Sequence, residues 1–135
     1  DATFAKIKDQ FKAGCLSEDE ILTTIKTCFN ETGYLLDTHT AIGYGVLKQY
    51  QQETGDHTKT VLLSTASPYK FPESVYQAIY GEELDVYTAI DKLSEKTGVP
   101  VPQALAGIKE REVLHKEAID KTEIISFIKS EIEAM

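Results

Sequence analysis

Two short segments of the sequence combine residue types that could bind or activate a ligand. The first, Asp37-Thr38-His39-Thr40, follows a short apolar run and precedes a helical pattern. A turn from a strand into a helix directs backbone N–H groups and the positive end of the helix towards a ligand. The simpler interpretation is that Asp37 or Thr38 only caps the helix and that His39 is a surface histidine. On spacing alone, the simpler interpretation is favoured.

The second segment, residues 64–71, reads Ser-Thr-Ala-Ser-Pro-Tyr-Lys-Phe. Its small residues Ser64, Thr65 and Ala66 follow an apolar run and leave room for a flat ligand beside the backbone. Hydroxyl groups and the ammonium of Lys70 supply hydrogen-bond donors. A proline turn with a solvated lysine explains the same residues almost as well, so the spacing alone does not establish a site.

The elements that must position these segments read as strand, helix and strand. Residues 34–36 (Tyr-Leu-Leu) and 60–64 (Thr-Val-Leu-Leu-Ser) are typical of buried strands, and a helical pattern lies between them. This βαβ unit, at about residues 33–71, predicts a parallel sheet with a right-handed crossover. Ligands bind beyond the carboxyl ends of such strands, where both segments lie. The predicted fold class is therefore α/β, a three-layer-like unit with a small, mainly parallel sheet flanked by helices.

Helices are expected on both sides of this unit. A capping box that starts at Ser17 precedes an amphipathic pattern, and Pro72 suits the first turn of another helix. A second capping box at Asp120 opens a C-terminal helix. Together with a strand-like run at residues 111–119, this helix predicts a closing strand and helix at about residues 111–135.

Composition limits the function classes. The sequence has 135 residues, which is one domain or a piece of a larger one. Its formal charge of −8 argues against nucleic acid as a partner, since phosphates require Lys and Arg. No apolar stretch approaches the ~20 residues of a membrane span, and none at the start resembles a signal peptide. Cys15 and Cys28 fit no zinc or redox spacing, so we expect two reduced thiols in a cytoplasmic protein.

Metal and nucleotide chemistry also lack support in the sequence. His39, His57 and His115 are scattered without paired ligand spacing, so no metal site is predicted. No nucleophile elbow, Walker loop or dinucleotide fingerprint is present. The two polar segments therefore stay the leading candidates for a site.

In order and spacing, two longer motifs around these segments resemble the threonine synthase family. Residues 33–41 read Gly-Tyr-Leu-Leu-Asp-Thr-His-Thr-Ala, where long-chain bacterial and fungal members carry Gly-Tyr, two hydrophobic residues and Asp-Pro-His-Thr-Ala. Residues 64–75 read Ser-Thr-Ala-Ser-Pro-Tyr-Lys-Phe-Pro-Glu-Ser-Val, where members carry Ser-Thr-Ala-His-Pro-Ala-Lys-Phe followed by Pro-Glu-Ser-Val or similar. The likeness extends over nearly the whole chain and corresponds to the final third or less of a family member.

The resemblance implies an incomplete, C-terminal part of a pyridoxal-phosphate (PLP) enzyme of fold type II. Such enzymes hold cofactor and substrate between two domains with twisted α/β sheets. The family reaction converts O-phosphohomoserine and water to threonine and phosphate, a carbon–oxygen lyase reaction of threonine biosynthesis. The implied cofactor of the full-length enzyme is therefore PLP, and its implied ligands are O-phosphohomoserine and phosphate.

Site roles follow from the resemblance position by position. Thr65 matches the hydroxyl residue that hydrogen-bonds the pyridine nitrogen in this fold type, and Ser64 and Ala66 flank it as cofactor-binding residues. Lys70 matches a lysine that helps to hold anionic groups near the site. The remaining substrate or site-shaping positions are Asp37, His39, Thr40 and Ser67.

The sequence departs from the family pattern at three positions: Thr38 stands for Pro, Ser67 for His and Tyr69 for Ala. Ser67 removes an imidazole close to the cofactor. The Schiff-base lysine and the phosphate-binding loop lie upstream in family members, and nothing here resembles them. We therefore expect a fragment that has no catalytic residue of its own and is inactive without the missing N-terminal part of the same chain.

Two other interpretations stay open. A non-enzymatic α/β binding or interaction module would have a self-contained core and a partner unrelated to PLP. A small phosphate-binding or transferase domain would need a nucleophile or a metal set, which the sequence does not contain. The fragment interpretation instead predicts exposed apolar surface, through which the chain would self-associate.

Overall fold

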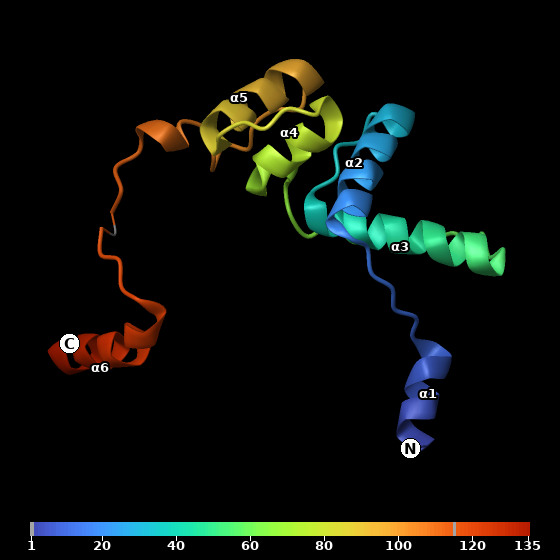
Figure 1. Ribbon diagram of the computed structural model, residues 1–135, viewed down its shortest axis with the longest axis horizontal. Helices are drawn as coiled ribbons and strands as arrows, with labels where there is room; N and C mark the ends of the chain where they lie inside the picture. Colours follow the sequence, from blue (N-terminus) through green and yellow to red (C-terminus); the bar gives the residue numbers. More distant parts are fainter. Residues whose placement is uncertain (1, 115) are drawn as a thin grey trace.

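The computed structural model describes residues 2–114 and 116–135, and over these ranges the chain is helical without a strand. Its α-helices are α1 (Ala2–Gln10), α2 (Glu18–Thr32), α3 (Thr38–Thr54), α4 (Pro72–Tyr80), α5 (Val86–Thr97) and α6 (Ile124–Ala134). Short 3-10 helices, η1 (Pro68–Lys70), η2 (Ile108–Glu110) and η3 (Lys121–Glu123), lie in the connections. In Figure 1, α2 to α5 gather in one group, called the central helices below, and α1 and α6 stand away from it.

The buried core belongs to the central helices. Helix α2 packs against both α3 and α4, and α4 also packs against α5 (Figure 1). Amphipathic spacing supplies each apolar face: Ile25 on α2, Val75 and Tyr76 on α4 and Leu93 on α5 are all fully buried. Burying one such side chain stabilises the fold by about 1.5–3 kcal/mol relative to leaving it exposed. The central helices therefore form the base on which the connecting segments lie.

Local sequence signals define several helix ends. The Ser17 side chain accepts a hydrogen bond from the backbone N–H of Glu20, and the Glu20 side chain accepts one from the backbone of Ser17. Helix α2 ends at Thr32, and its C-cap Gly33 has a φ of 73°, the left-handed conformation that favours glycine. Helix α4 begins at Pro72, and a second capping box at Asp120 precedes α6. The capping patterns in the sequence therefore predicted these boundaries correctly.

The predicted α/β fold class, with its βαβ unit and small parallel sheet, is wrong. No strand occurs in the described residues, and residues 34–36 and 60–64 form connections between helices. A strand exists only through backbone hydrogen bonds to a neighbouring strand, and an apolar run alone does not supply that neighbour. Leu35 and Leu36 are buried in the helical core, so burial explains their apolar character without a sheet.

The closing strand predicted at residues 111–119 is also absent from its described part, residues 111–114 and 116–119. Position 115 of that prediction lies outside the described residues. The helix expected after it is present as α6. Only the helical half of the predicted C-terminal unit is therefore found.

Helices α1 and α6 differ from the central helices in what they bury. Phe11, just beyond α1, is 69% exposed, and Ile125 on α6 is 70% exposed. An apolar stripe at helical spacing normally faces a partner, and among the residues whose burial is described the core of the central helices includes none from either end helix. In the described ranges, no helix has both the length and the apolar character required to cross a membrane.

Candidate functional site

Asp37 is the N-cap of α3 and the most enclosed polar residue of the first segment, residues 37–40. Its side chain is 1% exposed and accepts hydrogen bonds from the backbone N–H groups of His39, at 2.9 Å, and Thr40, at 3.3 Å. The Thr40 hydroxyl donates to the other carboxylate oxygen. These bonds satisfy N–H groups that the first helical turn leaves without partners, and the carboxylate faces the positive end of α3. Asp37 therefore organises the segment as its cap, in agreement with the simpler interpretation of the sequence.

Thr40 joins the first segment to the second segment, residues 64–71. Its Oγ1 atom lies 3.2 Å from Oγ of Ser64, although the two positions are 24 apart in the sequence. Thr40 is buried and Ser64 is exposed, so the contact joins a core residue to a surface residue. It places the start of the second segment beside the N-terminus of α3.

His39 makes a further contact between the segments. Its ring centroid lies 5.4 Å from that of Phe71, with an interplanar angle of 42°. Its Nδ1 atom lies 3.4 Å from Oδ1 of Asp37. The Nζ atom of Lys70 lies 5.7 Å from the centroid of the same Phe71 ring. An imidazole and an ammonium group therefore gather around one exposed aromatic ring.

A 3-10 turn fixes the backbone of the second segment. Ser67 is the N-cap of η1, and its hydroxyl accepts the N–H of Tyr69 at 3.2 Å. The N–H of Lys70 donates to the carbonyl of Ser67 at 2.9 Å. Tyr69 is buried, and its hydroxyl donates to the carbonyl of Val99 at 2.5 Å. The sequence indicates only added bulk at Tyr69 and gives no local signal for Val99, which lies 30 positions away.

Thr65 and its neighbours are open to a ligand. Ser64 and Thr65 are exposed, and Ala66 is half-buried. Within the part of the chain that the structure describes, the Thr65 hydroxyl makes no hydrogen bond. Its donor and acceptor positions are therefore both free to meet a ligand.

The predicted site residues all lie along two neighbouring stretches, the N-terminus of α3 and the chain that leads into α4 (Figure 1). The sequence predicts this proximity at the carboxyl ends of two parallel strands. The structure produces it differently, through the Thr40–Ser64 contact and the His39–Phe71 contact above the central helices. The two segments therefore meet, but no sheet edge brings them together.

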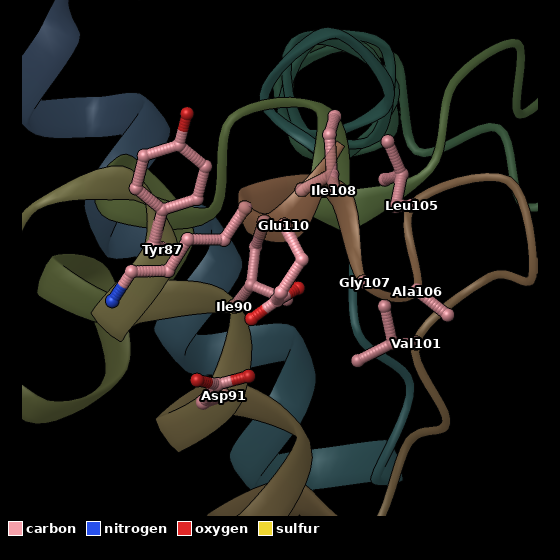
Figure 2. Close-up of a pocket in the computed structure, with 10 residues that line it drawn as sticks. Tyr87, Ile90, Asp91, Val101, Leu105, Ala106, Gly107, Ile108 and Glu110 are labelled. Atoms are coloured by element: carbon pink, nitrogen blue, oxygen red, sulfur yellow. The ribbon is translucent and has the colours of Figure 1, made fainter. Parts of the chain in front are cut away.

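Hollows also occur elsewhere on the surface of the described chain. One of about 250 Å³ separates α5 from the chain that follows it, with Ile90 and Asp91 on one side and Val101 and Leu105 on the other (Figure 2). Another, of about 270 Å³, includes Thr38 but no residue of the second segment. No group of three His, Cys, Asp or Glu side chains that could hold a metal ion occurs in residues 2–114 and 116–135.

Comparison with known sequences identifies relatives of this chain. Residues 40–128 match the family model described as threonine synthase, C-terminal. Threonine synthase-like 1 of Mus musculus is 32% identical over 111 residues, which is 79% of this chain and 14% of the mouse protein. Threonine synthase of Haemophilus influenzae is 40% identical over 82 residues, which is 59% of this chain and 18% of that enzyme.

A solved structure agrees with these sequence matches. The crystal structure of PLP-bound threonine synthase from Brucella melitensis superposes with a TM-score of 0.56 and 32% sequence identity. The match covers 80% of this chain and 19% of the Brucella chain. This chain thus spans less than a fifth of the length of each of these three relatives. Because the family model covers more than half of its residues, the chain belongs to the threonine synthase family, within the C-terminal region of that family.

Proposed function

We propose that this chain supplies one wall of the cofactor site of a PLP-dependent threonine synthase. The proposed reaction of the whole enzyme converts O-phosphohomoserine and water to threonine and phosphate. The observation that carries the proposal is the meeting of the two motif segments at Thr40 and Ser64, next to a Thr65 hydroxyl that has no partner in the described chain. Membership of the family and the likeness to a PLP-bound member support PLP as the cofactor.

The residues present fit a planar pyridine ring. When bound, PLP supplies an electron sink that stabilises negative charge at the substrate Cα. The exposed Thr65 side chain has a free hydroxyl, and its neighbours Ser64 and Ala66 are small enough to let a flat ring approach the backbone. In the proposed arrangement the Thr65 hydroxyl donates a hydrogen bond to the ring nitrogen and keeps its proton. A neutral donor holds the ring without protonating that nitrogen, which a carboxylic acid partner would do.

The remaining site residues have supporting roles in this proposal. Asp37 and Thr40 fix the N-terminus of α3 and, through Ser64, the start of the second segment. Lys70 and His39 lie around the ring of Phe71 and are suited to hold an anionic group of the ligand. Ser67 holds the 3-10 turn that follows Thr65. None of these groups is proposed to form the covalent bond to the cofactor.

The covalent anchor is proposed to come from the part of the enzyme that precedes this chain. Val61 is 83% exposed and Leu63 is 77% exposed, and both immediately precede the second segment. Apolar side chains exposed side by side next to a site are typical of a surface that another part of a protein covers. We therefore propose that the missing N-terminal part of the same chain packs there, and that this chain alone is inactive and self-associates through the same surface.

The role of Thr65 is tested in the full-length protein with Thr65→Val, which keeps the β-branched shape and removes the hydroxyl. We expect kcat/KM to fall at least tenfold, equivalent to about 1.4 kcal/mol of transition-state stabilisation. Thr65→Ser should retain most activity. The matched control is Thr23→Val, at an exposed position on α2 that belongs to neither segment, and it should leave kcat/KM unchanged. Equal kcat/KM for Thr65→Val and the parent protein would refute the cofactor role.

The missing anchor is tested by mixing this chain with PLP and reducing any Schiff base with borohydride. Peptide mass spectrometry should then find no specific PLP–lysine adduct. The same treatment of the full-length enzyme should label one lysine outside these 135 residues. A stoichiometric adduct at Lys70, or turnover by this chain alone, would contradict the proposal.

A further inference from the structure

Tyr69 is the one fully enclosed side chain of the second segment among its described residues. Its ring is 3% exposed and belongs to the core of the central helices, while Thr65 and Lys70 on either side of it are exposed. Because Tyr69 enters the core and Thr65 faces outwards, the position of Thr65 relative to the core depends on how firmly Tyr69 is held.

Two hydrogen bonds hold Tyr69 in place. Its backbone N–H donates to the Ser67 hydroxyl at 3.2 Å, which fixes the turn η1. Its phenolic hydroxyl donates to the carbonyl oxygen of Val99 at 2.5 Å. The first bond is local to the segment, whereas the second joins the segment to chain that follows α5, 30 positions away. Of these two bonds, only the second can fix Tyr69 relative to another element, and the Thr40–Ser64 contact holds the start of the segment separately.

The carbonyl group of Val99, which accepts this hydrogen bond, lies in a segment with restricted backbone freedom. Helix α5 ends at Thr97 with Gly98 as its C-cap, and the N–H of Val99 donates to the Thr97 hydroxyl at 3.2 Å. The following prolines, Pro100 and Pro102, restrict the backbone to extended conformations. Val101 then packs on the wall of the hollow opposite Ile90 (Figure 2). The carbonyl of Val99 is therefore a stiff anchor rather than part of a loose loop.

We infer that the Tyr69 hydroxyl is a positioning group, which holds the second segment so that Thr65 meets the cofactor ring at the correct distance. This inference rests on the proposed function of Thr65. Tyr69 touches neither cofactor nor substrate, and it acts through the turn that joins it to Thr65. A loss of the Val99 bond should loosen residues 64–70 without unfolding the core, because the Tyr69 ring stays buried.

The test uses the full-length protein and the variant Tyr69→Phe, which removes the hydroxyl and keeps the ring. The matched control is Tyr76→Phe, because Tyr76 is a fully buried tyrosine of the same core whose hydroxyl donates to Glu82, a residue outside the second segment. In the cofactor-free protein, we expect amide hydrogen exchange in residues 64–70 to become about fivefold faster in Tyr69→Phe and to stay at the parent rate in Tyr76→Phe. In the holoenzyme, Tyr69→Phe should shift the absorbance maximum of bound PLP and weaken PLP binding about fivefold.

The outcomes separate this inference from the proposed function. If the amide exchange rates of residues 64–70 are unchanged in Tyr69→Phe, the Tyr69–Val99 hydrogen bond does not hold the segment in place. That result would overturn the inference, whatever Thr65→Val does to activity. Faster exchange with an unaltered PLP spectrum and PLP affinity would overturn the positioning role, provided that Thr65→Val alters them. If Thr65→Val leaves the PLP spectrum unchanged, the proposed function of Thr65 fails. The exchange rates alone then show whether the Tyr69–Val99 hydrogen bond holds residues 64–70 in place.

Discussion

The central helices and the two end helices use similar apolar patterns to different effect. Ile25, Val75 and Leu93 on the central helices are fully buried, whereas Ile125 on α6 and Phe11 after α1 are largely exposed. Helices α2 and α6 both have amphipathic sequences, so the difference does not arise from the apolar pattern of each helix. It arises from whether a neighbouring element covers the apolar face. The two site segments lie against the central helices, whose packed core holds them in place.

The largest expected effect contrasts these two groups directly. Leu93→Ala deletes a fully buried side chain on α5 and should lower the free energy of unfolding by about 2–5 kcal/mol. Ile125→Ala on α6 makes a similar deletion at an exposed position and should cost less than about 0.5 kcal/mol in this chain. Urea unfolding followed by circular dichroism measures both. Equal costs would show that α6 packs on the core as firmly as α5 does.

A smaller difference in stability is expected between two helix caps that have the same hydrogen-bond pattern, one buried and one exposed. Asp37 and Asp85 each accept two backbone N–H groups and a threonine hydroxyl three positions later. Asp37 is buried and Asp85 is exposed. Asp37→Ala should lower the free energy of unfolding by about 2–3 kcal/mol, because it leaves buried donors without a partner, and Asp85→Ala should lower it by less. Urea midpoints of the two variants provide the comparison, and the reverse order would contradict the burial argument.

The exposed cap also predicts a pH dependence. The hydrogen bonds from the Thr88 hydroxyl and the Thr88 backbone N–H hold the pKa of the Asp85 carboxyl below its ordinary value of 3.8. Since the pKa is lowered in the folded state, the stabilisation is present above the unfolded pKa and is lost as the pH falls through the folded pKa. Carboxyl-carbon NMR titration should place the Asp85 midpoint below 3.8 and move it upwards in Thr88→Val. A midpoint at or above the ordinary value would contradict this.

The smallest effect on this chain is expected at the exposed residues before the second segment. Val61→Thr replaces a methyl group at an 83% exposed position and should change the free energy of unfolding of this chain by less than about 0.5 kcal/mol. In the full-length protein, the same change should cost more, because the N-terminal part is proposed to pack there. Parallel thermal melts of the two proteins measure the difference. Equal, small changes in both would argue against that packing surface.

Helix ends and the positions of the site segments follow largely from the sequence, whereas the fold class does not. The capping box at Ser17 and the proline at Pro72 are local signals, and both mark observed helix starts. Residues 60–64 are apolar and β-branched, which is typical of a strand, yet they form a connection here. A strand depends on a partner distant in sequence, and no property of residues 60–64 specifies one.

The candidate site divides in the same way. Asp37 was identifiable as a cap from its type and place, and the motif order indicated that the segments act together. The contacts that join them, Thr40 with Ser64 and Tyr69 with Val99, link positions 24 and 30 apart. Such contacts depend on the packing of α2 to α5, and no local pattern encodes them. The proximity of the segments was therefore predicted for a wrong reason, a sheet edge that the described chain does not contain.

The central claim is that Thr65 provides a neutral hydroxyl to the pyridine nitrogen of PLP. The most direct measurement is the nitrogen-15 NMR shift of ring-labelled PLP bound to the full-length enzyme. In the parent protein we expect the shift of a hydrogen-bonded but unprotonated nitrogen, and in Thr65→Val a change towards a nitrogen without that hydrogen bond. A protonated ring nitrogen in the parent protein, or the same shift in parent and variant, would contradict it.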